Sequence, residues 1–417
     1  MNVHVEKTVP ITYQMVVEAY ARVKSGGKAV GVDGESWKMF EAKGVEKQLY
    51  VVWNRMASGS YFPQAVREVE IPRKDGKLRK LGIPTVRDRI AQEVVRKYIE
   101  QRVDEKFHPN SYGYRPLKSA KQATDQVRSN CLQQDWVLDM DISKFFDEID
   151  HELMLKAVEH TIADRWVKVY VQRWLEMGIV KQDGTEVARG KKGTPQGGVI
   201  SPLLANLFLH FTLDKWLEKH YPHVKFVRYA DDVIVHCQTE LEAQQLQSAI
   251  RNRLHEVGLR LNEQKTKIVY CKDYRRKLKH SQVQFDFLGF SYQPRPTPSR
   301  IDPGRNFTVF VPEISKDNQK KIKDEIRGTI KWNNTSQQIE QIAEKLNRKI
   351  RGWINYFGVY GKRQLHKTLR YVDGRLIKWL SRKCKQGIRQ SIRQLSTIRQ
   401  NQPNLFYHWQ RLPGTEI

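Results

Sequence analysis

Two adjacent aspartates, Asp231 and Asp232, interrupt an apolar stretch and restrict the folds that this chain can adopt. They end the Tyr-Ala-Asp-Asp sequence at 229–232, inside a run, 226–235, that otherwise reads as two short buried strands of a hairpin. Neighbouring carboxylates in an apolar hairpin cost free energy unless something neutralises them. A divalent cation would do so, because hard cations take oxygen ligands. A solvated Asp-Asp turn, common in hairpins, is the competing interpretation.

The charge of the chain points to a polyanionic partner. Its 417 residues include 73 Lys and Arg against 46 Asp and Glu, a formal net charge of +27. Nucleic acid fits this surplus better than a membrane, because no basic helix shows a broad apolar face. The excess is concentrated in residues 315–417, which hold 23 Lys and Arg against 7 Asp and Glu. We expect binding to weaken steeply with salt.

The sequence shows neither an export signal nor a metal ribbon. No apolar run is long enough to span a bilayer, and residues 1–7 lack the hydrophobic region of a signal peptide. The four cysteines form no CxxC pair, so neither a zinc ribbon nor a disulfide framework is expected. We therefore expect a bacterial cytoplasmic protein with reduced cysteines, associated with nucleic acid and not with a membrane.

Periodicity and turn residues predict a mixed α and β chain of two or three domains. Residues 66–72 and 78–83 alternate as the strands of a basic hairpin, and 226–237 form a second hairpin. Four prolines between 294 and 303 indicate a loop or boundary, beyond which the chain is helical and basic. The other expected elements are a mostly helical segment at 1–65, a strand at 135–142, and helices at 84–103, 117–133, 203–219 and 239–257.

Five motifs follow one another along the chain: Asp141-Ile-Ser-Lys-Phe-Phe-Asp147, Gly193-Thr-Pro-Gln-Gly-Gly-Val-Ile-Ser-Pro-Leu-Leu204, Tyr229-Ala-Asp-Asp232, Leu261-Asn-Glu-Gln-Lys-Thr266 and Phe287-Leu-Gly-Phe290. Their order and spacing resemble the palm and fingers of reverse transcriptases, specifically the group II intron-encoded kind. The hairpin 71–84 and the stretch 111–116 resemble the same family, and residues 350–357 resemble a helix of its thumb, or maturase, domain. Each motif alone is weak to moderate evidence, whereas their common order is very specific.

The resemblance implies an α+β fold, a right-hand polymerase whose fingers and palm contain antiparallel sheet, followed by an α-helical thumb or maturase domain. The implied boundaries are an N-terminal extension at 1–65, fingers and palm at 66–292, the thumb at 293–385 and a short basic, DNA-binding-like tail at 386–417. In the family the N-terminal region binds template and intron RNA, so we expect template or RNA contact there.

The resemblance also implies a metal centre. Asp141 and Asp231 would be the principal ligands, Asp232 would complete the acidic cluster, and the backbone carbonyl of Ile142 could add a ligand. The expected cofactor is a pair of Mg²⁺ ions, for which Mn²⁺ could substitute. Asp139 shares a strand face with Asp141, but the family pattern favours Asp141. We expect Asp139 to be a hydrogen-bonded or salt-bridged acid near the site.

Three further residues of the palm acquire roles from the resemblance. Phe146 would lie under the incoming sugar and exclude its 2′-hydroxyl, with ordinary core packing as the alternative. Tyr229 would pack under the primer end, or serve the structure alone. Lys265 would protonate the leaving pyrophosphate or neutralise its charge, and a solvent-facing lysine is the alternative.

The nucleotide itself would be held by the fingers and by the Pro-Gln-Gly-Gly loop. Arg73 and Arg79 flank the turn of the basic hairpin and resemble the triphosphate contacts of the family. Non-specific template binding by the basic residues of this hairpin is the alternative. Gln196 would contact the nucleotide or the template base pair, since the neighbouring glycines let backbone approach the substrate.

In the thumb, basic and aromatic residues alternate. Arg348, Lys349 and Arg351 are the expected RNA contacts. Most of the aromatic residues should instead be core, because aromatics at helical spacing usually pack inside; they are Trp332, Trp353, Tyr356, Phe357, Trp379 and Trp409.

One departure from many relatives concerns a C-terminal zinc-stabilised His-Asn-His endonuclease. The last 100 residues contain one cysteine, Cys384, so we expect a form that lacks the nuclease. Such a form could not cut the second target strand and would use a pre-existing 3′ end.

The function implied is that of an RNA-directed DNA polymerase that is also an intron RNA-binding maturase, supporting splicing and retromobility of a group II intron by target-primed reverse transcription. Its expected partners are intron RNA, an RNA template with a DNA primer, target DNA and dNTPs. The alternatives are a polymerase-inactive RNA splicing factor and a domesticated reverse transcriptase in defence or repair. A DNA-templated polymerase is disfavoured by the thumb signature and by Ala230 in the acidic turn.

Overall fold

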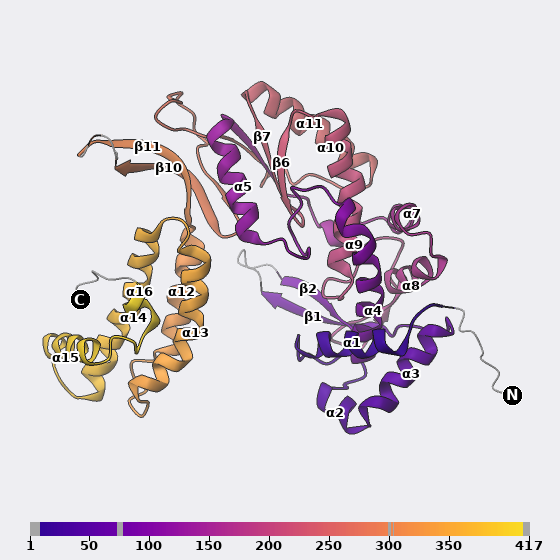
Figure 1. The fold of residues 1–417 in the computed structure, drawn as a ribbon, viewed down its shortest axis with the longest axis horizontal. Coiled ribbons are helices and arrows are strands. Elements are labelled where there is room, and N and C mark those ends of the chain that lie inside the picture. Colours follow the sequence, from indigo (N-terminus) through magenta and orange to yellow (C-terminus); the bar gives the residue numbers. More distant parts are fainter. Residues whose placement is uncertain (1–8, 73–77, 299–301, 303, 412–417) are drawn as a thin grey trace. The chain divides into compact units, whose positions relative to one another are not determined.

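The computed structural model describes residues 9–72, 78–298, 302 and 304–411. The chain divides into two compact units, one of residues 1–123 with 138–267 and the other of residues 124–137 with 268–417. Figure 1 shows the helices and strands of both units. Three elements cross the division: α5 (Ala120–Gln133), β3 (Trp136–Met140) and β8 (Lys267–Tyr270).

The first unit mixes helices with two small sheets. The expected helical N-terminal segment is confirmed, and its first helix packs on α4. The elements of this unit are α1 (Tyr13–Lys24), α2 (Trp37–Ala42), α3 (Val45–Ala57), β1 (Val66–Pro72), β2 (Leu78–Ile83), α4 (Val86–Val103), a 3₁₀ turn (Asp104–Lys106), α6 (Phe145–Glu148), α7 (His151–Thr161), α8 (Arg165–Glu176), β4 (Ile179–Val180), β5 (Glu186–Val187), α9 (Ser201–Leu209), a π-helical turn (His210–Asp214), α10 (Lys215–His220), β6 (Lys225–Tyr229), β7 (Asp232–Cys237) and α11 (Glu240–Glu256).

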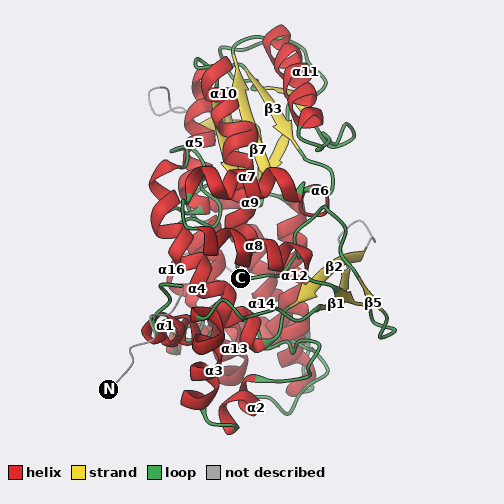
Figure 2. Ribbon diagram, turned by 90° about the vertical axis from the view of Figure 1, so that its right-hand side faces the viewer, coloured by secondary structure: helices red, strands yellow, loops and turns green. Residues whose placement is uncertain are grey.

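Both hairpins expected from the sequence are present. β1 and β2 pair antiparallel from Arg67 opposite Ile83 to Pro72 opposite Leu78, within a sheet of order β2-β1-β4-β5. β6 and β7 pair antiparallel up to Tyr229 opposite Asp232, within a sheet of order β6-β7-β3-β8. Helix α11 packs against β7 (Figure 2). The apolar residues of β6 and β7 are buried, as the sequence pattern predicts.

Helix α4 shows how local chemistry starts a buried helix. Its N-cap, Thr85, accepts a hydrogen bond from the Asp88 amide at 3.1 Å and donates its hydroxyl to the Asp88 carboxylate at 2.7 Å. Tyr61 donates a second hydroxyl bond to that carboxylate at 2.7 Å. Burial raises the pKa of Asp88, and these donors offset part of that effect.

The helix predicted at 203–219 is interrupted. A π-helical turn, His210–Asp214, separates α9 from α10, and such a turn inserts one extra residue into the helical repeat. The start also differs from a simple cap, because Ile200 occupies the N-cap position. The Ser201 hydroxyl donates instead to the Pro195 carbonyl at 2.8 Å. The serine therefore anchors the Pro-Gln-Gly-Gly loop rather than the helix end.

The second unit contains one sheet and a group of helices. Its own elements are β9 (Phe285–Phe287), β10 (Phe290–Pro298), β11 (Asn306–Ile314), α12 (Lys316–Thr329), α13 (Ile339–Phe357), α14 (Lys362–Lys383), α15 (Ile388–Asn401) and α16 (Tyr407–Arg411). Helices α12, α13 and α14 pack on one another, α15 packs on α14 and α16 packs on α13 (Figure 1). Residues 388–401 and 407–411 therefore pack on the thumb helices.

The prediction of a loop at the prolines between 294 and 303 is wrong for most of that segment. β10 extends to Pro298 and pairs with β11 in a sheet of order β11-β10-β9. β9 pairs only as far as Tyr292, so beyond that residue one side of β10 is an edge. Pro294, Pro296 and Pro298 alternate along the strand, and edge strands are where proline, which lacks an amide proton, is tolerated.

Half of the aromatic residues that were expected to be core are buried, namely Trp379, Trp409 and Phe357. Trp353 and Tyr356 are half-buried. Trp332 has 39% of its surface exposed, and the Arg382 guanidinium lies 4.3 Å from its ring centroid. This contact is a cation–π interaction at the surface.

Neither a membrane span nor a disulfide appears in the described part of the chain. None of its helices is both long and apolar enough to cross a bilayer. All four cysteines are free thiols, with Cys131, Cys237 and Cys271 buried and Cys384 exposed.

Candidate active site

The acidic turn is held in a strained backbone conformation. Ala230 joins β6 to Asp231 with a φ of +56°, in the left-handed region where a non-glycine residue is disfavoured by about 1–2 kcal/mol. Gly113 lies directly against this turn, since a Cβ at that position would sit 2.4 Å from the Ala230 nitrogen. The stretch 111–116 is thus placed beside the acids, which explains why a glycine is required there.

The two carboxylates of the turn repel each other, and the negative charge of Asp141 repels both. Burial raises the pKa of Asp232 to about 6, and the negative charges of Asp231 and Asp141 contribute to the rise. Burial likewise raises the pKa of Asp231, and Asp141 adds to it. The Asp232 side chain still reaches solvent, so the acids are crowded by protein but accessible.

Asp141 is held by the 261–266 motif. The Asn262 side-chain amide donates to Asp141 Oδ2 at 2.8 Å, and Lys265 Nζ lies 3.4 Å from the same oxygen. The Asn262 backbone amide also donates to the Asp141 carbonyl at 2.8 Å. Ile142 forms an isolated bridge with Leu261. Lys265 is therefore beside the acids and not merely in solvent. Asn262 was not singled out from the sequence, although it lies in a recognised motif.

The acids form no ready-made metal cage. Within the described residues, no group of three or more His, Cys, Asp or Glu side chains is arranged to hold a metal ion. The donor chemistry nevertheless suits Mg²⁺, which binds through one or two carboxylates together with substrate phosphates. Asp139 is half-buried on β3 and takes part in an interaction of its own.

On the side of the basic hairpin, Arg79 and Gln196 are in direct contact. Arg79 Nε donates to Gln196 Oε1 at 2.9 Å, which joins β2 to the Pro-Gln-Gly-Gly loop. The Gly82 amide donates to the Gln196 carbonyl at 2.8 Å. Burial raises the pKa of Asp231, and the positive charge of Arg79 offsets part of that rise, so the guanidinium and the acidic turn share one electrostatic environment. Arg73 lies outside the described residues.

Phe146 and Tyr229 are both half-buried, unlike ordinary core aromatics. Phe145 is the core residue of its pair, only 2% exposed, and Phe146 meets its edge at a centroid distance of 5.3 Å. The Thr194 amide donates to the Phe146 carbonyl at 2.8 Å. Tyr229 faces Tyr114 at a centroid distance of 6.3 Å. Burial and the charge of Asp231 raise the pKa of Tyr114, a residue given no role from the sequence.

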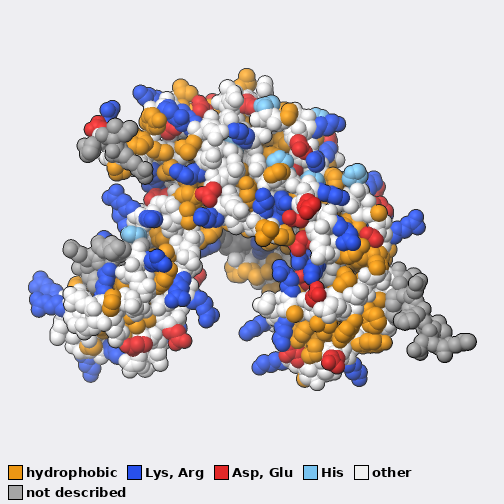
Figure 3. Space-filling model, viewed as in Figure 1, with side chains coloured by type: hydrophobic (Ala, Val, Ile, Leu, Met, Phe, Trp, Pro, Cys, Tyr) orange, Lys and Arg blue, Asp and Glu red, His pale blue; other side chains and the backbone are white. Residues whose placement is uncertain are grey.

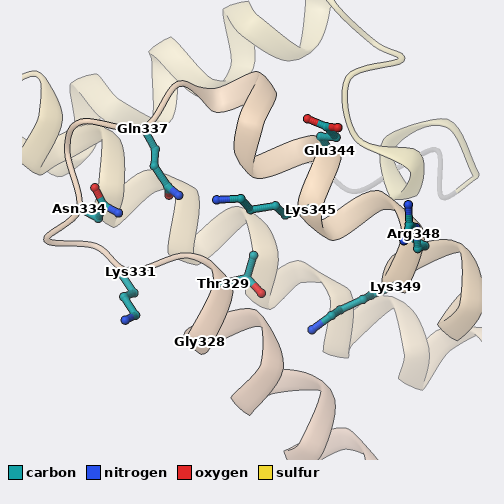
Figure 4. A pocket seen from close by; sticks show the side chains of 9 residues that line it. All are labelled: Gly328, Thr329, Lys331, Asn334, Gln337, Glu344, Lys345, Arg348 and Lys349. Carbon is teal, nitrogen blue, oxygen red and sulfur yellow. The ribbon is translucent and has the colours of Figure 1, made fainter. Parts of the chain in front are cut away.

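The expected RNA contacts lie on α13 in the second unit. Arg348 and Lys349 line a pocket of about 740 Å³, whose other lining residues are Gly328, Thr329, Lys331, Asn334, Gln337, Glu344 and Lys345. Figure 4 shows Lys345 and Lys349 extending from α13 toward the segment 328–337. Lys349 pairs with Glu325 at 2.9 Å. Arg351 is not in this pocket and lies 5.1 Å from the Tyr407 ring centroid. Lys and Arg side chains are frequent on the surface of these helices (Figure 3).

Two family models match separate parts of this chain. The family model described as reverse transcriptase (RNA-dependent DNA polymerase) matches residues 71–292. The chain belongs to the reverse transcriptase family, and its right-hand polymerase fold and helical thumb are those expected from the sequence. A second family model, the group II intron maturase-specific domain, matches residues 319–395. The protein is thus a reverse transcriptase with a group II intron maturase domain.

Several curated proteins are similar to this chain. Protein YkfC of Escherichia coli is 32% identical over 286 residues, covering 60% of this chain and 74% of that protein. Group II intron-encoded protein LtrA of Lactococcus lactis is 31% identical over 233 residues, covering 56% of this chain and 37% of its own length. The putative COX1/OXI3 intron 1 protein of Saccharomyces cerevisiae is 26% identical over 336 residues, covering 68% and 38%. The chain therefore spans less than two fifths of the intron proteins it matches.

The close packing of the Pro-Gln-Gly-Gly loop can be tested at Gly197. This residue has a φ of +116°, and a Cβ there would lie 2.8 Å from the Gly82 carbonyl oxygen. Gly197→Ala should lower the free energy of unfolding by more than the roughly 1 kcal/mol expected from backbone strain alone. Urea denaturation would measure the loss. Gly184→Ala is the matched control, because Gly184 also has a positive φ, +83°, but has open space around it. Equal losses in the two variants would contradict the close packing.

The crowding of the acids predicts a pH-dependent cost to stability. Because the folded-state pKa of Asp232 is raised to about 6, the folded protein binds its proton more tightly than the unfolded chain does. Stability should therefore fall as the pH rises from about 4 to 6. Without divalent ions, Asp232→Asn should raise the melting temperature at pH 7, on the order of 2 °C. That gain should disappear toward pH 4, and a pH-independent gain would count against the crowding. Thermal melts in EDTA measure it.

Proposed function

We propose that this protein is an active RNA-directed DNA polymerase that extends a DNA primer along an RNA template with dNTPs. The observation that carries the proposal is that Asp141 lies close enough to Asp231 and Asp232 for its charge to add to the burial that raises both of their pKa values. Arg79 and Gln196, joined at 2.9 Å, belong to the same electrostatic environment. Such a cluster of acids beside an arginine suits nucleotidyl transfer.

The carboxylates of Asp141, Asp231 and Asp232, with the carbonyl of Ile142, would hold two Mg²⁺ ions. When bound, the ions would lower the pKa of the primer hydroxyl and neutralise the triphosphate. Mn²⁺ has the same preference for oxygen ligands and could replace them. Carboxylates that repel one another in the free protein would be relieved by such cations.

The remaining residues of the site would bind and select the nucleotide. Arg79 would contact the triphosphate, and Gln196 would contact the base pair from the loop that it shares with Gly197. Phe146, half-exposed beside a core phenylalanine, would occupy the space of a 2′-hydroxyl. Lys265 would meet the leaving pyrophosphate from its position beside Asp141, and Tyr229 would support the primer end.

We also propose that the protein binds intron RNA as a maturase. The maturase-specific domain and the basic surface of α13 support this role. The RNA would perform splicing and reverse splicing itself, while the protein would stabilise its fold and then copy it from a primer in target DNA. With such partners, the place of action would be the bacterial cytoplasm. The alternatives are a polymerase-inactive splicing factor and a domesticated enzyme of defence or repair. Either would bind RNA without copying the intron into target DNA.

Primer extension tests the polymerase. An oligo(dT) primer on a poly(rA) template, with dTTP and Mg²⁺, should be extended by wild type. Asp231→Ala combined with Asp232→Ala should reduce the rate more than about 100-fold, since charge stabilisation at the reacting phosphate is lost. Asp183→Ala, on an exposed loop, is the matched control and should retain full activity. No synthesis by a folded, RNA-binding wild type would end the polymerase proposal and favour the splicing factor.

The basic pocket on α13 predicts a salt-dependent RNA contact. Lys345→Ala with Arg348→Ala should weaken binding of a single-stranded RNA and lower the slope of log K against log salt by about 1.4, roughly 0.7 for each lost phosphate contact. Fluorescence anisotropy at several salt concentrations would measure both. Lys168→Ala, which removes an exposed charge from α8 in the first unit, should leave the slope unchanged. Identical slopes for the double variant and wild type would remove this pocket from the RNA surface.

A further inference from the structure

Beneath the acidic turn lies an arginine that no part of the chemistry above requires. Arg228 is the second last residue of β6 and is completely buried. Its guanidinium binds Asp214 with two bonds, Nε to Oδ1 at 2.8 Å and Nη2 to Oδ2 at 2.5 Å. Its Nη1 donates to Asn206 Oδ1 at 2.9 Å and to the Ala230 carbonyl at 3.1 Å. The Arg228 side chain therefore links α9 and the π-helical turn to Ala230 in the acidic turn.

A contribution to folding stability does not by itself explain this buried ion pair. Asp214 is also completely buried, so both charges have been taken out of water. Desolvation of such a pair can cost as much as its attraction returns, and apolar residues of similar size often serve stability equally well. The arrangement does explain the π-helical turn, because Asp214 closes that turn and meets the guanidinium with both carboxylate oxygens.

The contacts around the arginine converge on the backbone of the turn. Asn206 Nδ2 donates to the Gly113 carbonyl at 2.6 Å, and Gly113 is the residue that lies against the Ala230 nitrogen. The Tyr112 amide donates to the Arg228 carbonyl at 2.8 Å. Ala230, with its disfavoured φ, is thus held on its carbonyl side by the Arg228 hydrogen bond and lies against Gly113 on its nitrogen side.

We propose that Arg228 is a positioning residue for nucleotidyl transfer: through its bond to the Ala230 carbonyl, it fixes the turn in the conformation that presents Asp231 and Asp232 together with Asp141. The inference rests on the proposed polymerase function. Removing the bond should leave the nucleotide contacts intact but let the acidic turn relax. Because a displacement of about 1 Å can cost 100-fold in rate, the loss should appear in kcat and in the Mg²⁺ requirement, with little change in the KM for dTTP.

The test separates positioning from stability with a charge-free replacement. Arg228→Met alone would leave Asp214 buried and uncompensated, and the variant could fail to fold. Arg228→Met with Asp214→Leu removes both charges and replaces them with apolar volume. Arg228→Lys keeps the charge beside Asp214 but has no planar fork with which to reach Ala230 as well. The matched control is Arg276→Met, because Arg276 is another buried arginine, paired with Asp273 and Asp135. Asp273 keeps a second ion pair, with Arg275 at 3.0 Å, so this single substitution leaves no aspartate uncompensated.

Melting temperature, kcat, the KM for dTTP and the half-saturating Mg²⁺ concentration are measured for each variant on poly(rA) with oligo(dT). We expect the double variant to melt near wild type, while kcat falls at least 10-fold and the half-saturating Mg²⁺ concentration rises. Arg228→Lys should show the same two changes, and Arg276→Met should show neither. Wild-type kcat and Mg²⁺ dependence in either Arg228→Lys or the double variant would overturn the inference. A wild type that makes no DNA would instead refute the polymerase proposal on which the inference rests.

Discussion

The repulsion among three carboxylates is the constraint on which the rest of the site depends. Burial raises the pKa values of Asp231 and Asp232, and the negative charge of Asp141 raises both further. The surrounding groups each lessen the resulting cost of ionisation, since Asn262 donates to Asp141, and the charges of Arg79 and Lys265 favour the ionised turn. The compensation is partial, because the pKa of Asp232 stays near 6. A site with this residual repulsion attracts cations, which is the property that phosphoryl transfer uses.

Holding repelling groups together requires a rigid backbone. In this structure the rigidity comes from close contacts between backbone segments and not from large side chains. Gly113 and Gly197 each bring backbone against backbone, one at the acidic turn and one at the Pro-Gln-Gly-Gly loop. Side chains of larger volume would push these segments apart. The strained φ of Ala230 persists for the same reason, since the Arg228 bond to its carbonyl and the close approach of Gly113 to its nitrogen hold it in place.

The sequence allowed the two hairpins, the helical N-terminal segment and the acidic turn to be predicted, because each depends on local periodicity and turn chemistry. Residues brought together from distant segments could not be predicted that way. The contact between Arg79 and Gln196 spans 117 positions and depends on how β2 meets the loop. Asn262 was overlooked because an asparagine in a turn has many ordinary uses. The loop predicted at the prolines of β10 was wrong for a different reason. Only the order of strands in the sheet shows that these prolines lie along an edge, where a strand tolerates them.

The proposed polymerase site and the proposed RNA surface place different demands on the sequence, so the sequence predicts specific residues for one more readily than for the other. In the proposed polymerase site the acids, their supporting amides and the buried arginine would each have to occupy one position, because a displacement of about 1 Å can cost 100-fold in rate. Phosphate binding depends instead on summed positive charge over a surface, to which many exposed lysines and arginines contribute similar amounts. The 23 basic residues of 315–417 therefore predict a polyanion surface clearly. They do not single out Lys345, which the pocket on α13 brings forward only once the helices are packed.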